Sequence, residues 1–172
     1  MSNFKEKLKG IKAFAFDVDG VLSGNIFLTA DGDQVRTMNM KDGYAIQLAA
    51  KKGFPIAIIS GGNSESIRTR FNRLGVTDVY LGSDNKLKDF KDFYFQHKLE
   101  PKDILYMGDD LPDYEIMKNT GVPTCPLNAA DDIKAISVYI SNINGGDGCV
   151  RDVIEQVLRA QNKWLDADAF SW

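Results

Sequence analysis

The stretch KAFAFDVDGVLSG, residues 12–24, places two aspartates directly after an apolar run. The run, residues 13–16, is typical of a strand that is buried on both faces, and Asp17 and Asp19 follow it one residue apart. Burying a carboxylate is costly unless the charge is paired or binds a metal ion. The rest of the chain must therefore explain why two acids stand at the end of a buried strand.

Length and composition limit the class of protein. The 172 residues are the length of one ordinary domain, so we expect a single domain over residues 1–172. With 24 acidic and 21 basic residues, the net charge of −3 lacks the basic excess of a nucleic-acid-binding protein. No apolar run approaches the roughly 18 residues of a membrane span, and residues 1–10 lack the apolar core of a signal peptide. We therefore expect a cytoplasmic protein without a nucleic-acid or membrane partner, in which Cys125 and Cys149 are free thiols.

Short β-rich runs alternate with amphipathic segments. Strands are predicted at residues 13–17, 55–60, 78–81, 104–107, 122–124 and 138–141, and helices at residues 43–52, 64–74, 86–98, 112–119 and 148–163. This alternation predicts an α/β fold, a parallel sheet with helices on both faces. Asp42 is expected to cap the helix that begins at Gly43.

One segment interrupts the alternation. Residues 25–40, NIFLTADGDQVRTMNM, are predicted to form a β-hairpin around Asp31-Gly32. The hairpin is too apolar for a solvated two-stranded ribbon, so we expect it to pack against other copies of the chain and to roof the site. The apolar residues are Ile26, Phe27, Leu28, Val35, Met38 and Met40. The C-terminal tail, residues 164–172, has no periodicity that predicts its role.

Polar residues gather where the predicted strands end, which is where ligands bind in parallel sheets. In chain order they are Asp17 and Asp19, then Ser60, Gly61 and Gly62, then Lys86 at a helix start, and finally Asp109, Asp110 and Asp113. Taken alone, an Asp-x-Asp pair is typical of a turn, Asp110 of a helix cap and Lys86 of a solvated lysine. In this order and context they favour a phosphoryl-transfer site.

Each group has a role in the hydrolysis of a phosphate monoester. Asp17 is the predicted nucleophile, which splits the reaction through an aspartyl-phosphate. Asp19 is expected to protonate the leaving alkoxide and then to activate water. The hydroxyl and backbone N–H groups of residues 60–62 are suited to hold phosphate oxygens, and Lys86 to neutralise the charge that develops.

The acids also predict a metal ion. Carboxylates and a phosphate repel one another, so a cation must gather them, and hard oxygen ligands favour Mg²⁺. The expected ligands are Asp17, Asp19 and Asp109, with Asp110 or Asp113 in support.

These motifs resemble the phosphatases of the haloacid dehalogenase superfamily, and within it the 3-deoxy-D-manno-octulosonate 8-phosphate phosphatases. Besides the hairpin, the resemblance over residues 12–158 rests on FDVDGVLSG, MKDGYAIQLA, IISGGNSESIRTRFNRLGV, GSDNK, YMGDDLPDYEIM and NGGDGCVRDVIE. It implies a Rossmann-like core with the hairpin as a flap, no large cap domain, a homotetramer, and Mg²⁺-dependent hydrolysis of that sugar phosphate in lipopolysaccharide biosynthesis. It also implies that Arg70 and Arg73 reach a neighbouring subunit's site and bind the carboxylate of the sugar acid.

Three other functions stay open. A phosphatase for a nine-carbon sugar acid phosphate is disfavoured by Gly62, because the resembling nine-carbon enzymes carry a glutamate there. A signalling receiver domain would end its third strand in the accepting aspartate, where this chain has Leu81-Gly82. A non-catalytic assembly module of the same fold would have lost Asp17, Asp19 or Lys86, and all three are present.

Overall fold

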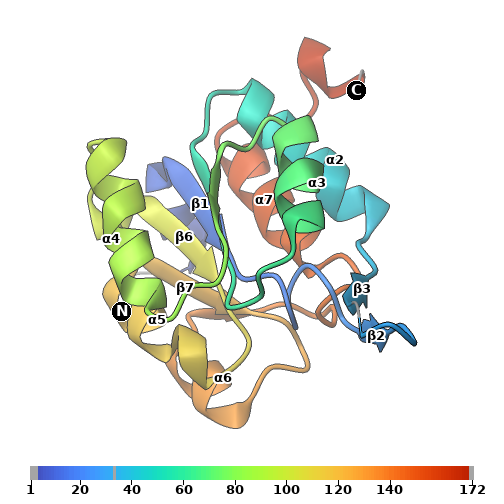
Figure 1. The fold of residues 1–172 in the computed structure, drawn as a ribbon. Helices are drawn as coiled ribbons and strands as arrows, with labels where there is room; N and C mark the ends of the chain where they lie inside the picture. The colour runs from blue at the N-terminus through green and yellow to red at the C-terminus, as the bar shows by residue number, and fades with distance from the viewer. Residues whose placement is uncertain (1–3, 33, 171–172) are drawn as a thin grey trace.

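The computed structural model describes residues 4–32 and 34–170, and its centre is a parallel sheet with helices on both faces (Figure 1). The strands lie in the order β5-β4-β1-β6-β7-β8, and all neighbouring pairs are parallel. The predicted α/β fold is confirmed. The strands are β1 Ala13–Phe16, β4 Ile56–Ile59, β5 Asp78–Tyr80, β6 Ile104–Met107, β7 Val122–Cys125 and β8 Tyr139–Ile140.

Two groups of helices cover the sheet. One face carries α2 (Met40–Lys51), α3 (Glu65–Arg73) and α7 (Cys149–Ala160), and the other carries α4 (Lys86–Gln96), α5 (Tyr114–Asn119) and α6 (Asp131–Ile136) (Figure 1). The shorter elements are α1 Phe4–Lys7 and the 3₁₀ turns η1 Leu8–Gly10, η2 Pro101–Asp103, η3 Leu111–Asp113 and η4 Ala167–Phe170.

Strand β1 shows why its sequence is apolar throughout. Phe14 and Phe16 pack into the core with α2, α3 and α7, whereas Ala13 and Ala15 pack into the core with α4, α5 and α6. All four side chains are fully buried. Because successive side chains point to opposite faces, a strand covered on both faces has no polar position.

The start of α2 differs from the prediction. The helix begins at Met40, and its cap is Asn39, whose side chain accepts a hydrogen bond from the backbone N–H of Lys41. Asp42 is buried inside the first turn and accepts a 2.6 Å hydrogen bond from the backbone N–H of Arg151, at the start of α7. The carboxylate therefore satisfies a donor at the start of a neighbouring helix instead of capping its own. Helix α6 was not predicted, because its six residues are too few to show a helical periodicity.

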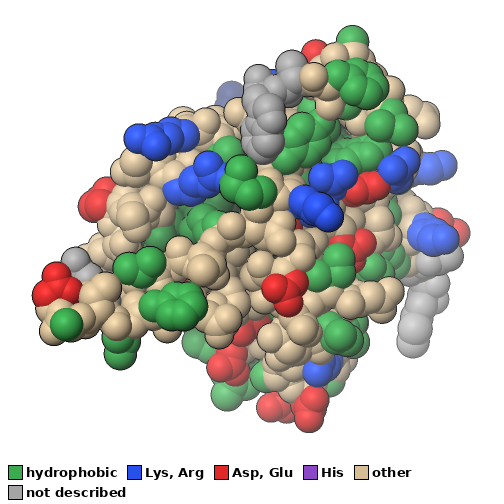
Figure 2. Space-filling model, turned by 90° about the vertical axis from the view of Figure 1, so that its right-hand side faces the viewer, with side chains coloured by type: hydrophobic (Ala, Val, Ile, Leu, Met, Phe, Trp, Pro, Cys, Tyr) green, Lys and Arg blue, Asp and Glu red, His purple; other side chains and the backbone are tan. Residues whose placement is uncertain are grey.

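The predicted hairpin forms and projects from the body as an arm (Figures 1 and 2). Strand β2 (Ile26–Leu28) pairs antiparallel with β3 (Gln34–Arg36), and they form a sheet of their own. Figure 2 shows hydrophobic side chains on the surface of this arm. Of the apolar residues expected to seek a partner, Met38 packs against the main core, and the rest are exposed: Ile26, Phe27, Leu28, Val35 and Met40.

The tail packs on α2 and α7. Trp164 is 6% exposed, and the guanidinium of Arg151 lies 4.3 Å from the centre of its ring. Lys52, at the end of α2, forms ion pairs with Asp166 and, at 3.1 Å, with Asp168. The tail as far as residue 170 is therefore part of this helical layer, which its sequence did not indicate.

Two further expectations can be compared with the structure. Cys125 and Cys149 are both buried and neither forms a disulfide, so the prediction of free thiols is confirmed. Across residues 4–32 and 34–170, the helices are all too short or too polar to cross a membrane.

Candidate functional site

The central position of β1 brings the predicted residues together. The chain runs from β1 outward to β4 and β5, and then returns to β6 on the other side of β1. Ligands bind at such a switch in direction, beyond the carboxyl ends of the strands. A cavity of about 800 Å³ opens there, and its lining includes Asp17, Asp19, Ser60, Lys86, Asp109 and Asp113.

Lys86 joins two acids at the floor of the cavity. Its Nζ lies 2.9 Å from Asp17 Oδ1 and 2.8 Å from Asp113 Oδ1. The Lys86 side chain is 9% exposed, and Asp17 and Asp113 are also buried. Burial opposes a charge on the lysine, but the two carboxylates outweigh it, so the pKa of Lys86 is raised. Lys86 is therefore a buried cation at the site and not a solvated lysine.

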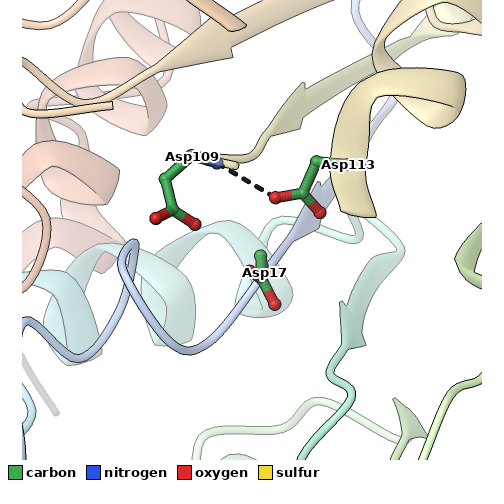
Figure 3. A group of neighbouring side chains, drawn as sticks. All are labelled: Asp17, Asp109 and Asp113. Atoms are coloured by element: carbon green, nitrogen blue, oxygen red, sulfur yellow. Dashed lines mark hydrogen bonds between the residues drawn. The ribbon is translucent and has the colours of Figure 1, made fainter. Parts of the chain in front are cut away.

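Asp113 holds this network in place. Its Oδ1 accepts hydrogen bonds from Lys86 and, at 2.6 Å, from the hydroxyl of Tyr106. Its Oδ2 accepts a 3.0 Å bond from the backbone N–H of Asp109 (Figure 3). Tyr106 is fully buried on β6 and was not predicted as a site residue. The signal was a tyrosine in an otherwise aliphatic strand, since a buried hydroxyl usually requires a partner.

Three carboxylates offer a place for a metal ion (Figure 3). Asp17, Asp109 and Asp113 each provide an oxygen within 4.8 Å of the others. Because the oxygens of Asp113 already accept hydrogen bonds, Asp17 and Asp109 have more capacity for a ligand. Asp109 Oδ1 is buried and accepts no hydrogen bond from the part of the chain that the structure describes, which is an incomplete arrangement for a carboxylate in a folded protein.

The raised pKa values of Asp17 and Asp109 also favour a cation among these carboxylates. Burial raises the pKa of Asp17, Asp113 raises it further, and Lys86 opposes both effects. Burial and Asp113 also raise the pKa of Asp109 to about 6. One lysine therefore does not offset the charge of these acids. The donor set of carboxylate oxygens without histidine or thiolate fits Mg²⁺.

Asp19 faces the same cavity but has a different partner. Arg36, from β3 of the hairpin, donates from Nε to Asp19 Oδ1 at 2.7 Å and from Nη2 to Oδ2 at 3.0 Å. The Asp19 carboxylate is thus bound to the hairpin and lies outside the three-carboxylate group. Arg36 was not predicted as a site residue, because a strand register does not reveal which loop a projecting arginine will contact.

Glycines shape the walls of the cavity. Gly20 has a φ of +91°, and a Cβ there would lie 2.0 Å from Asp109 Oδ2, so a side chain at this position would displace the acid. Gly62 donates its backbone N–H to Ser60 Oγ at 3.1 Å. Ser60, Gly61 and Gly62 all line the cavity.

The remaining predicted residues divide into two kinds. Asp110 is exposed and caps η3 by accepting a 2.8 Å hydrogen bond from the N–H of Leu111, so the capping alternative is observed. Arg70 packs beside Gly43 of α2, and Arg73 is exposed at the end of α3. Neither arginine is part of the cavity lining within one chain.

Comparison with known proteins gives close relatives. The search against family models found no match for the chain. This chain is 35% identical over 162 residues to 3-deoxy-D-manno-octulosonate 8-phosphate phosphatase KdsC of Escherichia coli K12. The aligned residues cover 94% of this chain and 86% of the relative. The enzyme of the same name from Yersinia pestis is 31% identical over 167 residues, which are 96% of this chain and 89% of the relative.

Solved structures agree with the sequence relatives. The crystal structure of the Yersinia pestis phosphatase matches with a TM-score of 0.91 at 31% identity, over 94% of this chain and 88% of that one. The phosphatase of Moraxella catarrhalis, in complex with magnesium, phosphate and KDO, matches with a TM-score of 0.88 at 35% identity, over 92% of each chain. With its acids, lysine and sheet arranged as described, the chain belongs to the 3-deoxy-D-manno-octulosonate 8-phosphate phosphatase family of the haloacid dehalogenase superfamily.

Proposed function

We propose that this protein is a Mg²⁺-dependent phosphatase that hydrolyses 3-deoxy-D-manno-octulosonate 8-phosphate to the free sugar acid and phosphate. The observation that carries this proposal is the Asp17–Lys86–Asp113 network beside the open Asp109 carboxylate, at the switch point between β1 and β6. The relatives named for this reaction match more than nine-tenths of the chain, which supports the choice of substrate.

Asp17 acts as the nucleophile in the first half of the reaction. One of its carboxylate oxygens attacks phosphorus, the bond between phosphorus and the sugar oxygen breaks, and the leaving oxygen takes a proton from Asp19. In the second half, Asp19 takes a proton from a water molecule whose oxygen attacks phosphorus. The bond to Asp17 then breaks, which releases phosphate and restores the carboxylate.

The other residues position the phosphate and balance charge. Lys86 lies 2.9 Å from the nucleophile and offsets negative charge as it develops on the transferred group. The Ser60 hydroxyl and the backbone N–H of Gly61 hold phosphate oxygens, while the N–H of Gly62 donates to Ser60 Oγ and fixes the hydroxyl. Asp17 and Asp109 would hold Mg²⁺, with Asp113 positioning Asp109 through its backbone N–H. When bound, Mg²⁺ supplies positive charge that lets carboxylates and phosphate come together.

A phosphate-release assay tests the proposal. We expect the eight-carbon substrate to have the highest kcat/KM in a panel that includes a nine-carbon sugar acid phosphate and simple sugar phosphates, and activity to require Mg²⁺. Higher kcat/KM on the nine-carbon substrate would refute the substrate assignment. Gly62→Glu is the informative variant, because a side chain at residue 62 enters the cavity next to Ser60 Oγ and Asp19 Oδ2. We expect it to shift preference toward the nine-carbon acid.

We also infer that the working enzyme is a cytoplasmic homotetramer assembled through the hairpin. Phe27 is 56% exposed and Leu28 is 74% exposed, which is unfavourable for an isolated arm in water. Burying such side chains between copies would enclose the cavity and bring Arg70 and Arg73 of one copy toward the site of another. Light scattering at micromolar concentration should give four copies, and Phe27→Lys should give smaller species with reduced activity. A fully active monomer would contradict this inference.

A further inference from the structure

The hairpin brings a buried cation, Arg36, against Asp19 at the edge of the cavity. The side chain of Arg36 is 5% exposed, although the neighbouring residues Val35 and Leu28 are at least half exposed. Arg36 lies opposite Ile26 in the hairpin register, on the same side of the ribbon as Gln34. Gln34 Oε1 accepts a 2.9 Å hydrogen bond from Arg36 Nη2 and so helps to hold the guanidinium in place.

The pair between Arg36 and Asp19 is more than a surface salt bridge. Two parallel hydrogen bonds, at 2.7 and 3.0 Å, join the planar guanidinium to both carboxylate oxygens. This arrangement fixes the orientation of a carboxylate as well as its distance. The Asp19 carboxylate, by contrast, remains 33% exposed and faces the cavity. The arginine therefore holds the acid from behind and leaves it open toward a ligand.

The burial of Arg36 is unfavourable for folding, so stability alone does not explain its position. Its Nη1 is buried and has no hydrogen-bond partner among residues 4–32 and 34–170, whereas a solvated arginine on the hairpin would meet water with all its donors. A local conflict of this kind is typical of a functional position.

The wall of the cavity leaves room for this arginine. A Cβ on Gly62 would lie 2.9 Å from Arg36 Nη2 and 3.4 Å from Asp19 Oδ2. Arg36 is a flexible side chain and can move away from a larger residue, but only by giving up its bonds to Asp19. The ion pair between Arg36 and Asp19 therefore requires a residue without a side chain at position 62.

We propose that Arg36 is a positioning residue, which orients Asp19 for proton transfer and makes that step depend on the placement of the hairpin. This inference rests on the proposed function, in which Asp19 exchanges a proton with the leaving oxygen and with water. It adds a residue that contacts Asp19 and need not touch the substrate.

A double-mutant cycle tests the inference. The value of kcat/KM is measured on an alkyl phosphate for the parent enzyme, Arg36→Gln, Asp19→Asn and the double variant. We expect Arg36→Gln to lose about 10- to 100-fold, as is usual for a residue that orients a functional group. We expect the double variant to be no worse than Asp19→Asn. Losses that multiply would overturn the inference, because Arg36 would then act independently of Asp19.

A second substrate separates positioning from folding or substrate binding. The leaving group of 4-nitrophenyl phosphate departs as a stable anion and needs little help from an acid. Arg36→Gln should therefore lose much less activity on this substrate than on the alkyl phosphate, and equal losses on both would overturn the inference. Arg36→Lys keeps the charge without the planar fork and serves if Arg36→Gln does not fold. Arg159→Gln, at an exposed arginine of α7, is the matched control and should change neither substrate.

The proposed function and the role of Arg36 can be refuted independently. Activity of the parent enzyme on the eight-carbon sugar phosphate decides the proposed function. The cycle can use whichever alkyl phosphate the parent enzyme hydrolyses, so its result decides the role of Arg36.

Discussion

Asp17 and Asp42 are both buried aspartates in different surroundings. Asp17 lies at the carboxyl edge of the sheet, and Asp42 lies at the contact between α2 and α7. Asp17 has Lys86 at 2.9 Å and two further carboxylates close by. Asp42 accepts a hydrogen bond from the backbone N–H of Arg151 and makes no ion pair among the residues that the structure describes. Burial raises the pKa of Asp42 to about 6, and the hydrogen bond from Arg151 opposes that shift.

The difference shows that a buried acid is not by itself a sign of catalysis. The carboxylate of Asp42 joins two helices, at the α7 N-terminus, where a negative charge is favourable. What distinguishes Asp17 is a cation on one side, an open cavity on the other, and further oxygens suited to a metal ion. The same Asp→Asn substitution should therefore abolish activity at residue 17 and change only stability at residue 42.

The largest effect is expected for Asp17→Asn. An amide cannot attack phosphorus, so kcat should fall by at least ~10⁴-fold, the scale seen when a nucleophile is removed. The fold should persist, because the change removes a buried charge that the site does not fully neutralise. The measurements are phosphate release and thermal unfolding on the same sample. Near-normal kcat would rule out Asp17 as the nucleophile.

Lys86→Gln should have the next largest effect and should act on both activity and stability. Loss of the cation next to the nucleophile should lower kcat by about 10²- to 10³-fold. It also leaves Asp17 and Asp113 buried without their partner, which should lower the free energy of unfolding by roughly 3–5 kcal/mol. Lys88→Gln, at an exposed lysine on the same helix, is the control and should leave both quantities unchanged. Equal behaviour of the two variants would contradict the assignment.

Asp42→Asn should leave kcat unchanged and alter only stability. Because the folded-state pKa of Asp42 is raised to about 6, the folded protein holds this proton more tightly than the unfolded chain. Proton binding by Asp42 therefore stabilises the folded protein. This contribution is fully present below pH about 4 and is lost as the pH rises through about 6.

At neutral pH, Asp42→Asn should therefore raise the free energy of unfolding by roughly 1–3 kcal/mol, and the gain should vanish toward pH 4. Urea unfolding across this pH range provides the measurement. A gain that did not depend on pH would mean that the charge of Asp42 is not its cause.

The strand ends were predictable because each signal is local. An apolar run followed by an acid locates both β1 with Asp17 and β6 with Asp109, and the alternation of elements places those ends at one edge. Tyr106 and Arg36 were missed because their roles depend on which atoms the fold brings near them. Asp42 was misassigned for a related reason, since a first-turn aspartate can satisfy its own helix or a neighbouring one. The arginines of α3 were predicted only by resemblance, and one chain does not bring them to the site.

The central place of β1 has a consequence for how the protein becomes active. Asp17 follows β1, the first strand in the sequence. Ser60 follows β4 on one side of β1, and Asp109 follows β6 on the other side. Contacts between segments so distant in sequence form slowly, because loop closure costs entropy before the contacts stabilise it. A refolding molecule with only one half of the sheet docked has a nucleophile but no complete acid group. Return of phosphatase activity during refolding therefore reports the docking of β6 onto β1, whereas helix signals can recover earlier.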